Sequence, residues 1–337
     1  MVRRGLVAAI GGLVAGRAMA QQPSVMVAWG STSYGVLNVP PGLYRKIEGG
    51  DRHAVAIRAD GTLASWGSNL FGETGVPSGQ FVDVAAGQWF SVGVRADGTL
   101  AAWGRTDIGI NPTPSGTYTA VAAGRMHALA LRTDGVVVGW GASLAGATNV
   151  PPGTFVAVAA GEDQSLAIRS DGTVVSWGQF AGGDPGGIFQ AIACARYSRV
   201  ALRTDGTLVG WGNDSGWGET VVPAGVFRSV ACGLGTCSAI LQSGSLLTWG
   251  FPLGTTPSGA HERVWSGDLF FYASRCYANC DDSTTLPVLN VNDFICYINL
   301  FASGSTQANC DGSMAVPALN VNDFVCFANR FSSGCGQ

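Results

Sequence analysis

The chain has 337 residues, of which 50 are glycine, about twice the usual share, whereas charged residues make up only 12%. Its 47% hydrophobic content excludes a disordered, collagen-like or coiled-coil chain. The net charge of −3 provides no positive field that could gather phosphates, so nucleic acid is not an expected partner.

The N-terminus has the order of a secretory signal. Arg3 and Arg4 precede an apolar run over residues 5–16, and Arg17 and a small-residue triplet at 18–20 follow it. We expect residues 1–20 to be a signal peptide and the protein to be secreted, either free or at the cell surface. The run is too short to span a membrane, and no later stretch reaches the required length of about 20 residues.

A repeat then fills most of the chain. The dipeptide Trp-Gly recurs at intervals of 34 to 38 residues, beginning at Trp29, Trp66, Trp103, Trp140, Trp177, Trp211 and Trp249. A Val or Ile followed by small residues also recurs seven times. Between these elements runs an alternating segment that ends in a turn, as in residues 129–135, and Asp-Gly between apolar runs favours a hairpin. Each unit therefore predicts three or four short antiparallel strands, at the period of a propeller blade.

The two ends of the repeat region complement each other. One lone strand is expected at residues 25–30, and the last unit, over residues 264–273, lacks the strand that would complete it. We therefore predict an all-β, seven-bladed β-propeller over residues 21–275, closed by its N- and C-terminal strands, which leaves no free sheet edge.

Residues 122–141 carry the pattern Ala-Ala-Gly-x-x-His-Ala-Leu-Ala-Leu-Arg-Thr-Asp-Gly-Val-Val-Val-Gly-Trp-Gly. This pattern resembles the regulator of chromosome condensation repeat, and the resemblance extends over residues 25–275 and implies the seven-bladed propeller. Loops after Trp-Gly, such as residues 69–77 and 149–152, resemble those of secreted bacterial β-lactamase inhibitor proteins on the same propeller. The exchange-factor role of the nuclear members is not carried over, because this chain is acidic and has an export signal.

Strand parity predicts a binding face. The connection after each Val-Ala-Ala-Gly and the connection after each Trp-Gly emerge at the same end of a blade, where aromatic residues alternate with charged ones. The candidate binding residues for a protein ligand are Tyr34, Phe71, Trp89, Phe90, Arg125, Met126, Arg196, Tyr197 and Trp217. The alternative is that these aromatic side chains pack between neighbouring blades as core.

The opposite face carries five Arg-x-Asp sequences, from Arg58/Asp60 to Arg203/Asp205, which we interpret as solvated pairs that stabilise turns. His53 and His127 share one repeat position and are predicted to be structural rather than ligands.

Three cysteines fall in the propeller. Cys194 and Cys232 occupy the same position of adjacent blades, which favours a bridge between them. The second possibility is Cys232–Cys237 across a short turn.

The last 62 residues form a different module, in which two segments 30 residues apart match each other. Oxygen-bearing side chains alternate in each and precede an apolar stripe with helical spacing, a pattern that suits Ca²⁺. This arrangement resembles a dockerin module, so residues 276–337 are expected to be a small α-helical, disulfide-rich unit that binds a cohesin-like or cell-surface partner. By that resemblance the Ca²⁺ ligands are Asn279, Asp281, Ser283, Asn290 and Asp293 in the first copy and Asn309, Asp311, Ser313, Asn320 and Asp323 in the second. The alternative is a pair of Asn/Asp-rich turns held by disulfides.

Six of the nine cysteines lie in this tail. Internal symmetry favours one bridge within each copy and a clasp between the ends of the module, that is Cys280–Cys296, Cys310–Cys326 and Cys276–Cys335. A zinc site is disfavoured because the tail has no His and no Cys-x-x-Cys pair.

No nucleophile elbow, phosphate loop or HExxH motif occurs in the chain. The leading hypothesis is an exported, non-enzymatic protein-binding propeller that its Ca²⁺-binding tail attaches to a surface or assembly. The alternatives are an extracellular lyase or hydrolase acting on polysaccharide, and an inhibitor of a secreted hydrolase such as a β-lactamase.

Overall fold

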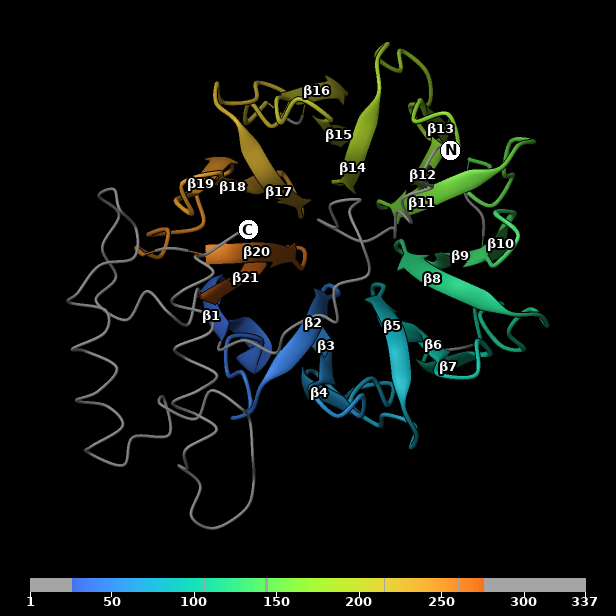
Figure 1. The fold of residues 1–337 in the computed structure, drawn as a ribbon. Coiled ribbons are helices and arrows are strands. Elements are labelled where there is room, and N and C mark those ends of the chain that lie inside the picture. The colour runs from blue at the N-terminus through green and yellow to red at the C-terminus, as the bar shows by residue number, and fades with distance from the viewer. Residues whose placement is uncertain (1–25, 106, 143–144, 215, 260, 276–337) are drawn as a thin grey trace, which may run out of the picture.

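The structure, a computed structural model, describes residues 26–105, 107–142, 145–214, 216–259 and 261–275. Within these ranges the chain forms seven three-stranded antiparallel sheets, arranged as blades around a central axis (Figure 1). The predicted seven-bladed propeller is therefore confirmed for this part of the chain. The predicted signal peptide, 1–20, and tail module, 276–337, lie outside the described residues.

Six blades are built from consecutive strands that run from the axis outward. Their strands are β2 Tyr44–Gly49, β3 His53–Arg58 and β4 Leu63–Gly67; β5 Phe81–Ala86, β6 Phe90–Arg95 and β7 Leu100–Gly104; β8 Tyr118–Ala123, β9 His127–Arg132 and β10 Val137–Gly141; β11 Phe155–Ala160, β12 Gln164–Arg169 and β13 Val174–Gly178; β14 Phe189–Cys194, β15 Ser198–Arg203 and β16 Leu208–Gly212; β17 Phe227–Cys232, β18 Thr236–Leu241 and β19 Leu246–Gly250. A short 3-10 helix, η1 (Ser33–Gly35), lies in the loop before the first of these blades.

The seventh blade joins the two ends of the repeat region, as the sequence predicts. Strand β1 (Met26–Gly30) pairs antiparallel with β21 (Phe270–Arg275), which pairs with β20 (His261–Ser266). Trp29 of β1 stacks on Phe271 of β21, with ring centroids 5.5 Å apart. The ring is closed by main-chain pairing and by this aromatic contact.

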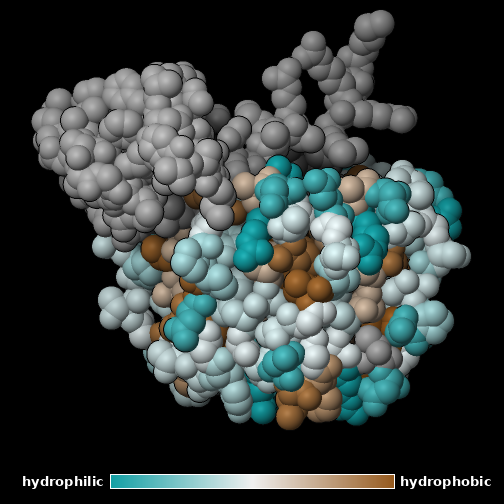
Figure 2. Space-filling view, turned by 90° about the horizontal axis from the view of Figure 1, so that it is seen from below, coloured by the Kyte–Doolittle hydropathy of each residue, from teal (hydrophilic) through white to brown (hydrophobic). Residues whose placement is uncertain are grey.

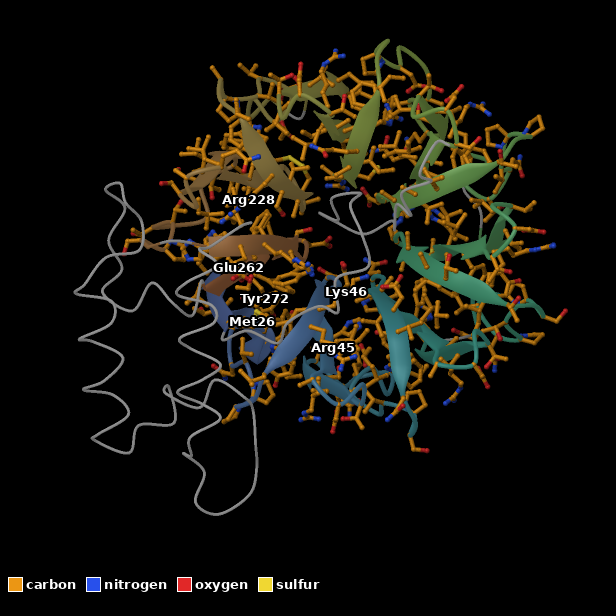
Figure 3. All side chains as sticks on the ribbon, in the orientation of Figure 1. Met26, Arg45, Lys46, Arg228, Glu262 and Tyr272 are labelled. Carbon is orange, nitrogen blue, oxygen red and sulfur yellow. A yellow bond between two sulfur atoms is a disulfide. The ribbon has the colours of Figure 1, made fainter. Side chains whose placement is uncertain are left out.

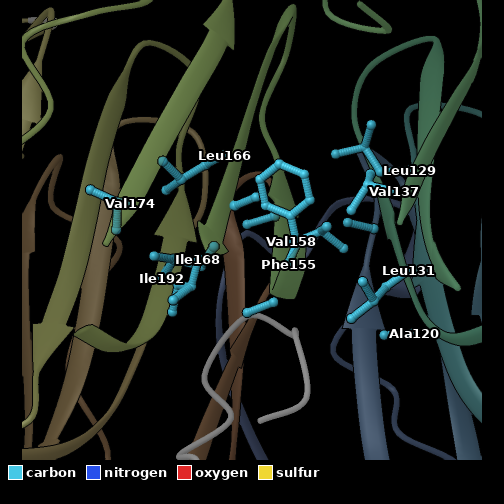
Figure 4. Packing of buried hydrophobic residues seen from close by; sticks show 14 of the residues in the cluster. Ala120, Leu129, Leu131, Val137, Phe155, Val158, Leu166, Ile168, Val174 and Ile192 are labelled. Carbon is cyan, nitrogen blue, oxygen red and sulfur yellow. The ribbon is translucent and has the colours of Figure 1, made fainter. Parts of the chain in front are cut away.

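The hydrophobic core lies between blades rather than in one central mass. Phe155 and Val158 of β11 lie between the side chains of β9 and β10 on one side and those of β12 and β13 on the other (Figure 4). Both residues are at most 3% exposed. Each blade therefore depends on its neighbours for burial of its faces, which is the reason that a closed ring is needed.

Close approach of backbones explains two repeated glycines. Gly50 follows the first inner strand, and a Cβ there would lie 2.1 Å from the carbonyl oxygen of Gly87 in the next blade. Gly67, of Trp-Gly, has a φ of +100°, and a Cβ there would lie 2.6 Å from the Arg52 carbonyl oxygen. Small residues at the axis and glycine after tryptophan are thus steric requirements of the fold.

The repeated tryptophan joins adjacent blades. In five blades its Nε1 donates a hydrogen bond to a backbone carbonyl 30 residues earlier, in the loop of the preceding blade, at 2.7 to 3.0 Å. Trp103, for example, donates to the Glu73 carbonyl. Trp211 instead donates to the Asp184 carboxylate at 3.2 Å. The contact recurs because each repeat has nearly the same length, so the tryptophan and its carbonyl partner keep the same separation along the chain.

A buried ionic contact adds a further link between blades. Lys46, labelled on β2 in Figure 3, is 1% exposed, and its Nζ lies 2.6 Å from Asp83 Oδ1 of β5 and 3.2 Å from Glu48 Oε1. Asp83 Oδ2 in turn accepts the Val121 amide of the third blade. Burial alone would lower the pKa of Lys46, but the carboxylates of Asp83 and Glu48 raise it, so the ammonium group stays charged.

The structure corrects one disulfide prediction. Cys232 is bonded to Cys237, with which it pairs directly across β17 and β18, while Cys194 is a free thiol. The favoured Cys194–Cys232 bridge is therefore wrong and the second possibility is confirmed. Burial raises the pKa of the Cys194 thiol to about 12, which keeps it protonated.

The visible outer side of the ring offers no broad apolar surface. Seen from below the orientation of Figure 1, hydrophobic residues form several separate patches among hydrophilic ones (Figure 2). Nothing helical among the described residues has the length and hydropathy needed to cross a bilayer.

Candidate functional site

The loops that were predicted to form one face do lie together. Antiparallel pairing places the exit of each inner strand and the exit of each outer strand at the same end of a blade. Contacts between the two kinds of loop confirm this arrangement, because Phe71, after one Trp-Gly, packs against Trp89, which lies between β5 and β6. We call this end the aromatic face and define it by Tyr34, Phe71, Trp89, Phe180, Tyr197, Trp217 and Phe251.

One cluster on the aromatic face combines two rings with a guanidinium that lies over both. Phe71 and Trp89 have centroids 5.8 Å apart. Arg105 lies over both rings, 5.4 Å from the centroid of Phe71 and 5.1 Å from that of Trp89. The cluster spans the loops of two neighbouring blades, so it fixes those loops relative to each other while it stays open to solvent.

Similar contacts occur around the rest of the face. Phe180 meets Tyr197 edge to face at 5.4 Å, and the Arg196 guanidinium lies 4.9 Å from the Tyr197 ring centroid. Trp217 meets Phe251 in the same way at 4.8 Å. The rings of each pair therefore lie against one another.

Part of each cluster remains exposed. Tyr34 is 55%, Phe71 is 41%, Phe180 is 46% and Trp217 is 53% exposed. The alternative that the predicted aromatic residues form core applies to Phe90 alone, which is fully buried among the side chains between blades. Phe90 is therefore removed from the candidate binding residues.

Other predicted residues lie nearer the axis. Arg125 and Met126 are partly exposed, and Arg125 is ion-paired with Asp163 at 2.7 Å and with Glu162 at 3.4 Å. Arg196 also pairs with Glu162. Sequence reasoning missed Arg105 and Phe251 as members of the clusters, although each directly follows a Trp-Gly dipeptide and a systematic reading of that position would have found them.

A cavity of about 260 Å³ opens at the centre of the aromatic face. One residue from each blade follows the small residues of the inner strand and forms the mouth of the cavity, in the order Asp51, Gln88, Arg125, Glu162, Arg196, Leu234 and Asp268. Main-chain hydrogen bonds between blades hold this mouth, for example from Arg125 N to Glu162 O at 3.0 Å and from Asp268 N to Gly50 O at 3.2 Å. Below the mouth the walls are mainly alanine, glycine and valine.

Two carboxyl groups that line the cavity, those of Asp268 and Glu48, have raised pKa values. Burial, with the nearby charges of Asp51 and Glu162, raises the pKa of Asp268 to about 7, against the opposing effect of Arg196. Burial also raises the pKa of Glu48 to about 7 despite its ion pair with Lys46. A negative charge in this cavity is therefore costly unless a cation accompanies it.

On the opposite face, the aspartates of the Arg-x-Asp sequences stabilise turns as predicted, but most of the arginines do not pair with them. Each aspartate of the Arg-x-Asp sequences stabilises its own turn, as when Asp60 Oδ1 accepts the Thr62 amide at 2.9 Å. Arg132 pairs with Asp134, but Arg95 lies over the Phe81 ring and donates to the Ser78 carbonyl at 2.8 Å. Most of these arginines therefore pack on the inner strand and do not form the expected pairs.

The two repeated histidines are structural, as predicted. His53 and His127 are buried, and their Nε2 atoms lie 2.8 Å and 3.0 Å from Ser91 Oγ and Ser165 Oγ of the next blade. Burial lowers the pKa of each to about 4, so both rings are neutral at physiological pH. Among the described residues, no group of three His, Cys, Asp or Glu side chains has the geometry of a metal site.

Residues 44–73 match the sequence model of the regulator of chromosome condensation (RCC1) repeat. No curated protein matches the chain. Among solved structures, Prp20p from Saccharomyces cerevisiae has a TM-score of 0.65 and 18% identity, over 75% of this chain and 91% of that one. Human WBSCR16 has a TM-score of 0.61 and 17% identity, over 75% and 99%. The fold is similar to that of the RCC1 propellers. A third structure, the ectodomain of the receptor kinase CR4 from Physcomitrella patens, has a TM-score of 0.57 and 22% identity, over 66% and 67%.

Proposed function

We propose that this chain is an exported, non-enzymatic propeller that binds a protein through its aromatic face. The observation that carries the proposal is the set of partly exposed aromatic clusters, two of which include an arginine, on loops from several blades around one cavity. Tyrosine, tryptophan and arginine are enriched among the few residues that contribute most of the affinity at protein interfaces. Ring-to-ring contacts hold these side chains in place before a partner arrives, which lowers the entropy lost on binding.

The structurally similar proteins support the proposal that the ligand of this propeller is a protein. Prp20p is described as binding Gsp1p and histones, and in another structure it is bound to Kap60. The identity of the partner does not carry over at 18% to 19% sequence identity. A secreted hydrolase, such as a β-lactamase, is one candidate protein ligand. It is included in the test because the loops after Trp-Gly resemble those of β-lactamase inhibitor proteins.

The experiment captures partners on the immobilised full chain from the extracellular fraction of the source cells, with a purified β-lactamase tested beside it. We expect Trp217→Ala and Trp89→Ala each to weaken capture by about 2 kcal/mol, or roughly 30-fold. Arg132→Ala and Val136→Ala, in one exposed turn of the opposite face, are the matched controls and should leave capture unchanged. Loss of capture in the controls but not in the aromatic variants would overturn the proposed face.

We also propose that the dockerin-like tail binds two Ca²⁺ ions and attaches the propeller to a cohesin-like or cell-surface partner. The support is the duplicated run of oxygen-bearing side chains in the sequence, with only two or three carboxylates per loop. Few carboxylates predict a dissociation constant of about 10⁻⁴ to 10⁻³ M. Titration calorimetry of the full chain should show Ca²⁺ heats that the double variant Asp293→Ala/Asp323→Ala loses. Absence of heat, or heat that the double variant keeps, would leave the loops as turns held by disulfides.

A further inference from the structure

The cavity at the centre of the aromatic face has a particular balance of charge. On one side of its mouth, Arg125 and Arg196 are neutralised by Glu162 and Asp163. On the other side, Asp268 and Asp51 come from the seventh and first blades, which are neighbours in the closed ring. The excess charge of the mouth is therefore negative and lies on the side of Asp268.

Asp268 has no side-chain partner of its own. Asp51 is paired with Arg52 at 3.2 Å, and deeper in the cavity Glu48 is paired with Lys46. Among the residues that the structure describes, no side chain forms an ion pair with Asp268 and none donates a hydrogen bond to its partly exposed carboxylate. Its raised pKa reflects the same situation, because burial and two neighbouring acids disfavour its ionised form.

The rest of the cavity suits a single long side chain. Its volume of about 260 Å³ lies just below the range of roughly 300–1,000 Å³ that is usual for small-molecule sites. Alanine side chains, including Ala85, Ala122 and Ala159, provide apolar walls that an alkyl stem can contact. Lysine and arginine combine such a stem with a cationic end.

We propose that the central cavity receives one lysine or arginine side chain of the protein partner, whose cationic group pairs with Asp268. The inference rests on the proposed function, since the partner is the protein that docks on the surrounding aromatic face. The inserted side chain would occupy the centre of the interface, where the aromatic clusters exclude water around it, and such central positions contribute most to affinity. A partner that covers the cavity without a protruding basic residue would remove water from the carboxylate of Asp268 and leave it unpaired, so the cavity also contributes specificity.

The test uses small probes, so that it does not depend on the identity of the partner. Nα-acetyl-arginine methylamide and Nα-acetyl-lysine methylamide are titrated into the full chain and followed by saturation-transfer NMR. Nα-acetyl-citrulline methylamide, which is nearly the same shape as the arginine probe and uncharged, is the control ligand. We expect the two basic probes to bind with millimolar dissociation constants and the citrulline probe to bind at least tenfold more weakly.

Two variants locate the binding. Asp268→Asn should weaken the binding of the basic probes at least tenfold. Asp205→Asn, in an exposed turn of the opposite face, should leave their binding unchanged. Asp268→Asn removes a charge that is costly to bury, so we expect its melting temperature at pH 8 to be no lower than that of the wild type. If its fold is nevertheless lost, Asp51→Asn replaces it, with a smaller expected weakening of about threefold.

Equal binding of the charged and neutral probes, no binding of any probe, or full binding by Asp268→Asn would overturn the inference. Trp217→Ala should leave probe binding unchanged, because the tryptophan lies outside the lining of the cavity. Partner capture that depends on Trp217 but not on Asp268 would therefore retain the proposed function and reject the basic side chain in the cavity.

Discussion

At the scale of single residues, the first position of the middle strand is occupied by different types of side chain in different blades. The first residue of the middle strand is His53, Phe90, His127, Gln164 or Ser198 in successive blades, and all five are buried. The histidines contact a serine of the next blade, and Gln164 donates to the Ala195 carbonyl at 3.0 Å. The position therefore requires burial against the neighbouring blade rather than a particular functional group.

The substitution His127→Gln should reduce the acid sensitivity of the fold. The folded pKa of His127 is lowered to about 4, so between pH 6.5 and 4 the unfolded chain binds more protons and stability falls as the pH falls. From pH 7 to pH 5 the wild type should lose about 2 kcal/mol more than the variant, in urea unfolding at both pH values. Asp268 and Glu48, with pKa values raised to about 7, have the opposite sign in both proteins, so they cancel in the comparison. An identical loss in the two proteins would show that His127 does not titrate as its burial requires.

At the scale of elements, the tryptophan contact between blades should be measurable. Trp103→Phe removes the hydrogen bond to the Glu73 carbonyl, whereas Trp29→Phe removes an indole nitrogen that has no hydrogen-bond partner among the described residues. Both substitutions lose the same volume at buried positions. We expect Trp103→Phe to lower the free energy of unfolding by about 1 kcal/mol more than Trp29→Phe. Equal costs would mean that the repeated tryptophan acts through packing alone.

The blades were predictable because each unit carries its own local signals for strand, turn and Trp-Gly contact. Features that depend on contacts between strands or between blades were harder to predict, because no single repeat unit shows them. Phe90 shares the repeat position of His53 and is buried for the same reason, yet the loop beside it suggested an exposed residue. Asp268 belongs to the mouth of the cavity only because the ring closes, and reading the same connection in all seven units would have revealed it. The Cys232–Cys237 bridge follows from cross-strand register, which the sequence left open.

At the scale of the whole molecule, the ring should depend on strand β1. A chain beginning at Gln21 keeps β1, whereas a chain beginning at Ser31 loses it together with the Trp29–Phe271 stack and exposes the edge of β21. Exposed strand edges pair with other chains, so the shorter protein should associate with rising concentration in light scattering. It should also be less stable than the longer one by more than about 3 kcal/mol, since it lacks a buried tryptophan and a strand pairing. A monomeric shorter chain of equal stability would contradict closure by β1.

The arrangement of the whole ring also separates two surfaces of different character. The aromatic face gathers clustered rings, arginines and the cavity mouth, whereas the opposite face includes short turns in which aspartates accept hydrogen bonds from their own loops. Polar groups that are satisfied within a turn have little to gain from a partner. The difference between the two faces is therefore the basis of the proposed function.

Amide hydrogen exchange of the full chain, with and without the captured partner, tests this difference most directly. Binding through the aromatic face should slow exchange in the loops at residues 50–52, 68–75, 88–89, 196–197 and 216–218, and leave the turns at residues 59–62, 96–99 and 133–136 unchanged. Slowed exchange in those turns, with none in the loops of the aromatic face, would contradict the account.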